Sequence, residues 1–144
     1  MLPPSNEYGE LPPGVHRAAW SDIERRFGWG GEARLRAFAI LKHVHELAAR
    51  TGALRNFYVF GSFVSALPHP RDVDVLLVMQ ESFRLEDCPE ESRPLFSHAE
   101  AQARYGATVF WLRHGVLGET SMRAFLRAWQ TTRDGKIRGI LEIA

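Results

Sequence analysis

The residues best suited to chemistry in this chain lie in two short motifs separated by nine residues. Gly61-Ser62 follows one apolar run, and the pair Asp72 and Asp74 opens a second. Alternate residues of a strand point to the same face, so the two carboxylates are expected to project together. Paired carboxylates repel each other unless a cation lies between them. The spacing therefore predicts a divalent metal site with Asp72 and Asp74 as ligands.

The Gly-Ser pair has the composition of a phosphate-binding turn. Gly61 has no side chain, so the backbone there can approach a phosphate closely. Ser62 adds a hydroxyl group, and the backbone N–H groups at the start of the next helical turn are free to meet an anion. A hard cation such as Mg²⁺ is suited to bridging triphosphate oxygens. Each motif alone is common, but the two together favour a binding site over a solvated pair of acids.

Strands are expected around both motifs. Apolar runs rich in β-branched and aromatic residues predict four of them, at residues 57–60, 73–79, 108–113 and 137–143. Asp134-Gly135 supplies the positive φ angles of a tight turn, so the turn 133–136 is expected to lead into the second strand of a hairpin. The polar stretch 80–94 is expected to be an exposed loop.

Helical spacing predicts the other elements, at residues 21–28, 32–50, 97–105 and 120–129. The first is expected to begin with a capping box, in which Ser21 caps and Glu24 reaches back. The second is expected to bury one stripe, formed by Leu35, Phe38, Leu41 (or Ala39), Val44 and Ala48.

These elements predict an α+β (or α/β) fold with a small mixed sheet flanked by helices. The 144 residues fit one domain, and 45% hydrophobic residues are enough to build a single core. Residues 1–14 contain four prolines and are expected to form an extended tail, followed by a single domain at 15–144.

Composition also bears on partners and compartment. The formal net charge of +1 gives no overall electrostatic reason to bind nucleic acid or a membrane. The single cysteine, Cys88, excludes an internal disulfide, and no apolar run is long enough to span a bilayer. A cytoplasmic location without a membrane partner is therefore expected. Cys88 lies among acidic residues, which should disfavour its thiolate, so it is not expected to be a nucleophile.

Gly61-Ser62, nine intervening residues and Asp72-Val73-Asp74 resemble the signature of the polymerase-β-like nucleotidyltransferase superfamily. In that superfamily the serine contacts the phosphates and the paired acids hold the metals. The resemblance implies that Gly61 and Ser62 bind a nucleoside triphosphate. It also implies that Asp72 and Asp74 are catalytic ligands of Mg²⁺ or Mn²⁺.

Further segments look like a family of small, largely uncharacterised bacterial and phage proteins that is treated as nucleotidyltransferase-like. They are residues 11–16, Trp20, 26–28, 58–65, 109–111, 131–135 and 139–140. This second resemblance runs along nearly the whole chain and implies a nucleotidyltransferase-like fold. Some minimal nucleotidyltransferases act as antitoxins that modify a partner toxin, so a toxin–antitoxin pair is one implied setting.

The chain departs from the superfamily at one position. Active members usually carry a third carboxylate on a later strand, and the matching strand here is expected at residues 107–112. Thr108 occupies the position of that acid. Threonine is neutral and a poor base, so two-metal catalysis is in question. Glu86, Asp87 and Glu100 are alternative acids that spacing does not separate.

Two functions remain open. The first is Mg²⁺-dependent transfer of a nucleoside monophosphate from an NTP to a hydroxyl of a protein or small molecule. The second is a catalytically impaired module that binds a nucleotide or a partner protein, for example as half of a toxin–antitoxin pair. Arg71 and Lys136 are expected on the surface rather than on phosphate. Phe110 and Trp111 are expected in the core rather than against a base.

Overall fold

The structure, a computed structural model, describes residues 2–132 and 134–143. In these residues one mixed sheet has the strand order β1-β5-β2-β3-β4. Its strands are β1 Val15–Ala18, β2 Leu54–Phe60, β3 Val73–Met79, β4 Ala107–Arg113 and β5 Ile140–Ile143. β1 pairs with β5 and β3 with β4 in parallel, whereas β2 is antiparallel to both β3 and β5. The predicted α+β class with a small mixed sheet is confirmed.

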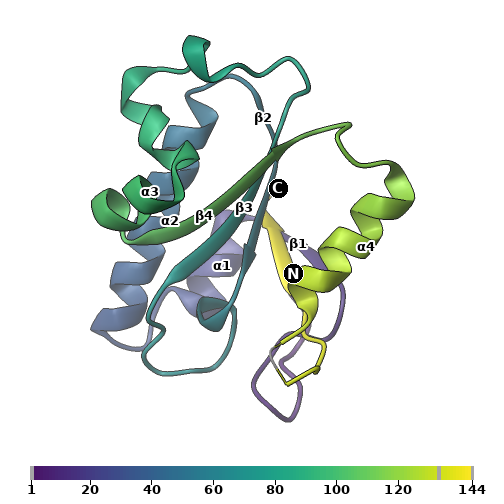
Figure 1. Cartoon of the computed structure of the whole chain (residues 1–144). Coiled ribbons are helices and arrows are strands. Elements are labelled where there is room, and N and C mark those ends of the chain that lie inside the picture. Colours follow the sequence, from purple (N-terminus) through teal and green to yellow (C-terminus); the bar gives the residue numbers. More distant parts are fainter. Residues whose placement is uncertain (1, 133, 144) are drawn as a thin grey trace.

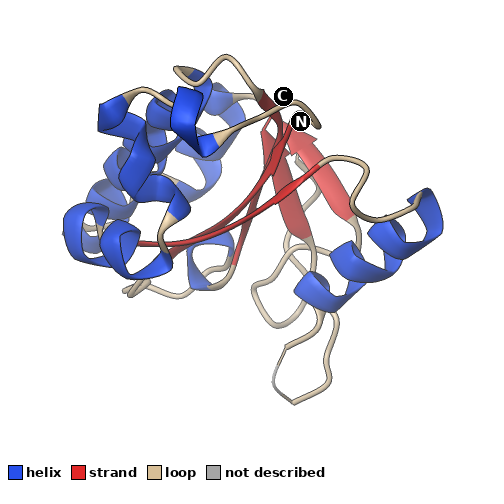
Figure 2. Cartoon of the chain, turned by 45° about the horizontal axis from the view of Figure 1, so that its top comes forward, coloured by secondary structure: helices blue, strands red, loops and turns tan. Residues whose placement is uncertain are grey.

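Helices lie on both faces of the sheet (Figures 1 and 2). One face is covered by α1 Trp20–Phe27, α2 Glu32–Ala49 and α3 His98–Tyr105, and the other carries α4 Glu119–Gln130. Short 3₁₀ turns occur at η1 Ser62–Val64, η2 Leu85–Asp87 and η3 Glu90–Phe96. The main core lies between the sheet and the first group of helices, and a smaller apolar cluster lies beneath α4.

β3 is the central strand for the candidate site. It lies between β2 and β4, and its alternate residues pack on opposite faces. Val75 and Leu77 belong to the main core, whereas Leu76 and Val78 belong to the cluster beneath α4. This double burial explains why the strand is a nearly continuous apolar run. Asp74 has the same parity as Leu76, so its carboxylate projects on the α4 side.

The first helix begins differently from the prediction. Ser21 does not cap it. The helix starts at Trp20, and the Asp22 carboxylate accepts a hydrogen bond from the backbone N–H of Ala19 at 3.1 Å. An acidic side chain in the first turn accepts a hydrogen bond from that free donor. Its negative charge also interacts favourably with the positive end of the helix dipole. The predicted end near Gly28 is confirmed.

The bounds predicted for the second helix are confirmed to within one residue, but its buried stripe is partly wrong. Leu41, Val44 and Ala48 are buried as expected, whereas Leu35 is 58% exposed. Arg34 is buried instead. A guanidinium takes the inward position there because backbone carbonyls lie within its reach.

The predicted C-terminal hairpin forms only beside its turn. After the turn, only the bridge between Thr131 and Ile137 pairs the two arms among the described residues, and Arg133 lies outside them. β5 instead inserts between β1 and β2, with Ile140 opposite Val15 and Glu142 opposite Tyr58. The cause is β1, a strand that the sequence did not predict and that offers β5 a partner from the other end of the chain.

The stretch 80–94 is exposed along most of its length, as its polarity predicted, but it is not a plain loop. Its backbone forms η2 and most of η3, and its buried side chains are Phe83, Cys88, Ser92 and Pro94. Burial is the main cause of a raised pKa for the Cys88 thiol, and the nearby charge of Arg93 opposes that shift. The thiolate is therefore disfavoured by desolvation, and not by acidic neighbours as the sequence suggested.

The N-terminal segment, residues 2–14, packs against the domain. Leu11 is only 1% exposed. The backbone N–H of Ala66 donates to the Gly9 carbonyl at 2.8 Å, and the N–H of Gly139 donates to the Leu11 carbonyl at 2.9 Å. The segment thus joins the loop after Gly61-Ser62 to the entry of β5.

Candidate functional site

One row of residues crosses three strands on the α4 side of the sheet. Phe60 at the end of β2 pairs with Asp74 on β3, and Asp74 pairs with Thr108 on β4. Neighbouring strands lie about 4.8 Å apart, so these three side chains are immediate neighbours. Asp74 occupies the middle of the row and Gly61 follows Phe60 directly.

The backbone of Gly61 lies against the Asp74 carboxylate. A Cβ atom built on Gly61 would be 2.1 Å from Asp74 Oδ2, which is far inside van der Waals contact. Gly61 also has φ +84°, a left-handed conformation that side chains disfavour. Glycine is therefore required at this position for two reasons: the turn needs a left-handed conformation, and the Asp74 carboxylate leaves no room for a Cβ atom. The sequence had connected this glycine with a phosphate, not with the acid.

The electrostatic state of Asp74 reflects its surroundings. Burial raises the pKa of this carboxyl, and the negative charge of Asp72 raises it further. A hydrogen bond with Thr108 and the positive charge of Arg138 act in the opposite direction. A partly buried acid beside a second acid is the arrangement that a bound cation would relieve.

Asp72 lies just before β3 and does not line the same cavity as Asp74. It borders a small cavity of about 60 Å³ against α2, together with Arg36, Ile40 and Gly106. Its charge is nevertheless close enough to shift the pKa of Asp74. The two predicted ligands are therefore coupled electrostatically, although they border different hollows.

Ser62 opens the 3₁₀ turn η1, and its backbone carbonyl accepts a hydrogen bond from the Ser65 hydroxyl at 2.6 Å. That bond closes the turn. Ser62 lines a cavity of about 360 Å³ that also contains Ser65, Glu10 and Arg138. Gly61 and Ser62 thus face two adjoining hollows, and Arg138 borders both.

The larger of these hollows, here named the α4 cleft, encloses about 720 Å³ between the sheet and the end of α4. Its lining combines the row across the sheet with residues from α4 and the segment that follows it. The lining residues are Phe60, Gly61, Asp74, Thr108, Phe110, Ala128, Trp129, Thr131, Thr132, Asp134 and Arg138. Its size is within the range of small-molecule and cofactor sites.

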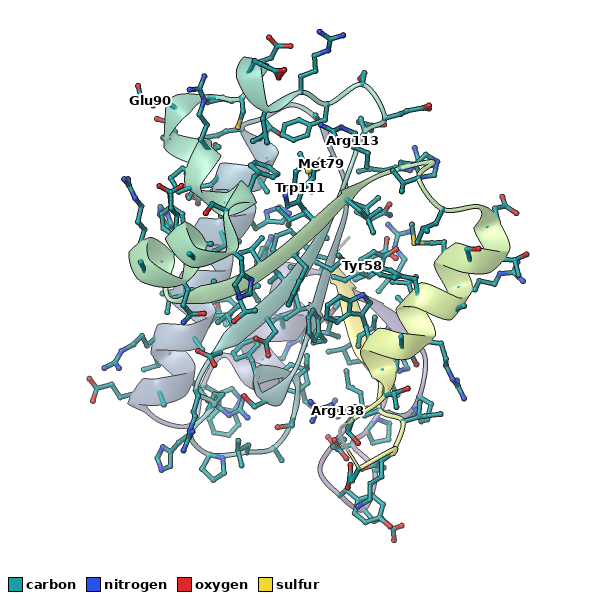
Figure 3. The ribbon with its side chains drawn as sticks, in the orientation of Figure 1. Tyr58, Met79, Glu90, Trp111, Arg113 and Arg138 are labelled. Carbon is teal, nitrogen blue, oxygen red and sulfur yellow. The ribbon has the colours of Figure 1, made fainter. Side chains whose placement is uncertain are left out.

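Arg138 is a cleft residue that the sequence did not single out. Its guanidinium Nη1 donates to Glu10 Oε2 at 3.0 Å, and both side chains are largely shielded from solvent. Figure 3 places Arg138 beneath the C-terminal end of α4. Arg71 and Lys136, the two cations considered from the sequence, are exposed, and neither lines the α4 cleft. Only tertiary contacts bring Arg138 close enough to act on Asp74.

Thr108 stands where the sequence placed it, directly beside Asp74 on β4. Its Oγ1 atom is also 3.1 Å from Gln102 Oε1. The hydroxyl has one proton and serves one acceptor at a time. The position next to Asp74 that a third carboxylate would take is thus occupied by a neutral hydroxyl.

None of the three alternative acids lines the α4 cleft. Glu86 and Asp87 lie in η2, beyond the far end of β3, roughly 20 Å along the strand from Asp74. Glu100 is exposed in the first turn of α3, which belongs to the opposite helical layer. The cleft does contain another carboxylate, Asp134, whose pKa is lowered mainly by a hydrogen bond from Thr132.

Phe110 and Trp111 have opposite surroundings. Trp111 packs edge-on against Phe83 and Phe96, at the border of the main core. Phe110 is 36% exposed and lines the α4 cleft, so the expected core position is wrong for this residue. The alternation of β4 explains the difference, because only one face of that strand meets the main core.

Arg34 holds the loop after Gly61-Ser62 in place. Its guanidinium donates to the carbonyls of Phe27 at 3.2 Å and Phe63 at 3.0 Å, and also to those of Ser65 and Leu67. Three of these four acceptors belong to the loop. Burial lowers the pKa of the guanidinium, and the four carbonyl dipoles offset that desolvation.

The carboxylates of Asp72 and Asp74 are chemically suited to a divalent cation, although they border different hollows. Carboxylate oxygens are hard ligands, and Mg²⁺ is commonly bound by one or two carboxylates together with substrate phosphates. Residues 2–132 and 134–143 contain no group of three or more His, Cys, Asp or Glu side chains placed to hold a metal ion.

Within residues 2–132 and 134–143 no helix is long and apolar enough to cross a membrane.

Comparison with curated proteins and with solved structures gave no match. One family model matches residues 3–144, which is nearly the whole chain, and its description is "Family of unknown function (DUF6932)". The chain belongs to this family.

Proposed function

We propose that this protein is a Mg²⁺-dependent nucleotidyltransferase-like protein that transfers a nucleoside monophosphate from an NTP to a hydroxyl of a protein or small molecule. The contact between Gly61 and Asp74 carries this proposal. In this contact a turn suited to phosphate lies against an acid suited to a metal, and both residues line a cleft large enough for a nucleotide.

Each residue has a defined role in the proposed reaction. The backbone at Gly61 and the hydroxyl of Ser62 bind the triphosphate, while Asp72 and Asp74 hold the cation. Mg²⁺ or Mn²⁺ bound there supplies positive charge to the phosphate oxygens. The acceptor hydroxyl attacks the α-phosphorus, a new P–O ester bond forms, the bond to the β-phosphate breaks, and pyrophosphate leaves. The hydroxyl proton passes to solvent.

Arg138 supports the same assignment. It borders both hollows beside the Gly-Ser turn, and its guanidinium is held by Glu10 rather than free in solvent. A pre-oriented guanidinium is suited to a phosphate oxygen. We infer that Arg138 contacts the triphosphate.

Thr108 favours a second candidate function. With a neutral hydroxyl beside Asp74, the protein would bind the nucleotide but turn it over poorly, and would work through a partner protein, for example in a toxin–antitoxin pair. Nucleotide binding at the same site is common to both candidates, so turnover distinguishes them.

Titration calorimetry with ATP and Mg²⁺ tests the binding site. The wild-type protein should bind, and Asp74→Ala should weaken binding about thirtyfold or more because it removes a charged ligand from the site. Leu35→Ala, an exposed apolar residue on the opposite helical layer, is the matched control and should bind normally. Equal affinity of Asp74→Ala and the wild type would refute the site.

Transfer of label from α-labelled NTP separates the two candidates. Labelling of protein or of small acceptors by the wild type supports the transferase. If the wild type binds without transfer, the module is favoured, and Thr108→Asp should then restore turnover by supplying the third carboxylate. Thr108→Asn is its uncharged control and should remain inactive.

A further inference from the structure

The α4 cleft has an aromatic wall, formed by Phe60, Phe110 and Trp129. The ring centroids of Phe60 and Trp129 are 4.5 Å apart, and those of Phe110 and Trp129 are 4.8 Å apart. Phe60 and Phe110 are 6.4 Å apart, so the three rings form one continuous surface. The wall joins two strands to α4.

The wall begins next to the proposed phosphate site. Phe60 directly precedes Gly61 and pairs with Asp74 in the sheet. Phe110 is the next residue after Thr108 on the same face of β4, about 7 Å further along the strand. A ligand with phosphates at Gly61 therefore has a flat apolar surface within the reach of one nucleoside.

Two observations distinguish this wall from ordinary packing. Phe110 keeps 36% of its surface exposed although it lies among other aromatic rings. The indole Nε1 of Trp129 is buried and has no hydrogen-bond acceptor among the described residues. A buried donor without a partner is costly, and such a group calls for a structural or functional reason.

We propose that the aromatic wall is the nucleobase subsite of the α4 cleft, so that the protein recognises the base of the NTP by stacking on Phe110 and Trp129. This inference rests on the proposed function, because the phosphates must lie at Gly61. Every base has a flat π surface, so stacking favours nucleotides over inorganic polyphosphates without selecting one base.

The test compares ATP with inorganic triphosphate, both with Mg²⁺, by titration calorimetry. Phe110→Ala should weaken ATP binding about tenfold, because it removes a ring on which the base stacks, and should leave triphosphate binding within twofold. Leu35→Ala is the control for loss of an exposed apolar side chain. Melting curves of each variant verify folding, and Phe110→Leu repeats the test with an apolar side chain that lacks a π surface.

Trp129→Phe gives an independent test. It keeps an aromatic ring but reduces the stacking surface, so it should weaken ATP binding severalfold and leave triphosphate binding within twofold. Unchanged ATP affinity would mean that the indole only packs.

The outcomes of these two proposals differ. If the wild type binds neither ATP nor triphosphate, the proposed function fails, and the base subsite fails with it. If the wild type binds ATP and Phe110→Ala and Phe110→Leu bind it equally well, the aromatic wall is not the base subsite, although the phosphate site stands.

Discussion

At position 61 only glycine leaves room for the Asp74 carboxylate. Gly61→Ala would bring Cβ to 2.1 Å from Oδ2 and would strain a residue with φ +84°. We expect a loss of about 1–3 kcal/mol in the free energy of unfolding and loss of Mg²⁺-dependent ATP binding, because the carboxylate must move. Chemical denaturation and calorimetry measure the two effects.

Gly52→Ala is the matched control. Gly52 has φ +71°, but a Cβ atom there would meet nothing within 4 Å. Gly52→Ala should lower the free energy of unfolding only by the cost of placing alanine in a left-handed conformation. It should bind the nucleotide as the wild type does. If both variants bind ATP equally well, the contact between Gly61 and Asp74 has no part in the site.

The raised pKa of Asp74 leads to a prediction about how the folding stability depends on pH. Because the folded protein holds this proton more tightly than the unfolded chain does, the contribution of Asp74 to stability is complete below the unfolded pKa of about 3.8. It is lost as pH rises through the folded pKa. Without divalent ions, Asp74→Asn should therefore melt a few degrees higher than the wild type near pH 7, and the difference should shrink in acid.

Added Mg²⁺ and ATP should reverse this order, because they stabilise the wild type and not the variant. Melting curves at several pH values, with and without these ligands, measure both effects. A variant that is less stable than the wild type at neutral pH would show that the Asp74 carboxylate is not under electrostatic strain.

At the scale of elements, α2 positions the Gly-Ser loop through one buried side chain. Arg34→Met keeps an unbranched side chain but leaves four carbonyls without their donor. We expect a loss of about 3 kcal/mol or more in the free energy of unfolding, since an unsatisfied buried carbonyl costs about 1–3 kcal/mol. Urea denaturation measures this loss, and proteolysis should cut the loop 61–67 first.

Arg36→Met, two residues along the same helix, is the control. Arg36 forms an exposed ion pair with Glu32 at 3.3 Å, and such pairs contribute little. Its variant should change stability by less than about 0.5 kcal/mol. Similar losses for the two variants would mean that the carbonyl contacts of Arg34 do not hold the loop.

At the scale of the whole molecule, the N-terminal segment connects parts of the chain that are distant in sequence. Leu11 is buried in the main core, and Glu10 binds Arg138. Leu11→Ala should lower the free energy of unfolding by about 2–5 kcal/mol through the cavity that it leaves. Leu67→Ala, at a residue that is 49% exposed, should be nearly neutral.

Removal of residues 1–10 tests the same connection. It deletes Glu10, frees the Arg138 guanidinium and opens the hollow beside Ser62. We expect lower stability than in the full chain. If the shortened chain melts at the same temperature, residues 1–10 are a separable tail, as the proposed boundary at residue 14 implies.

Local patterns determined much of this protein. The alternation around Asp74 identified β3, and Ser97 and Gly106, which cap α3, marked its two ends. The resemblance to the nucleotidyltransferase superfamily placed Thr108 beside Asp74, and the register of β3 with β4 confirms that position. The inferences about β3 and α3 depend on residues close in sequence, which composition and periodicity reveal.

Tertiary structure alone decided the rest. The pairing of Val15 with Ile140 ended the predicted hairpin soon after its turn, and the contact of Glu10 with Arg138 placed a guanidinium at the site. Phe110 faces α4 because that helix folds back over one face of the sheet. These contacts join residues far apart along the chain, and their free energy depends on which surfaces meet after folding. No local period encodes that choice, so the sequence specified the acid pair and the glycine, whereas the fold specified the cleft around them.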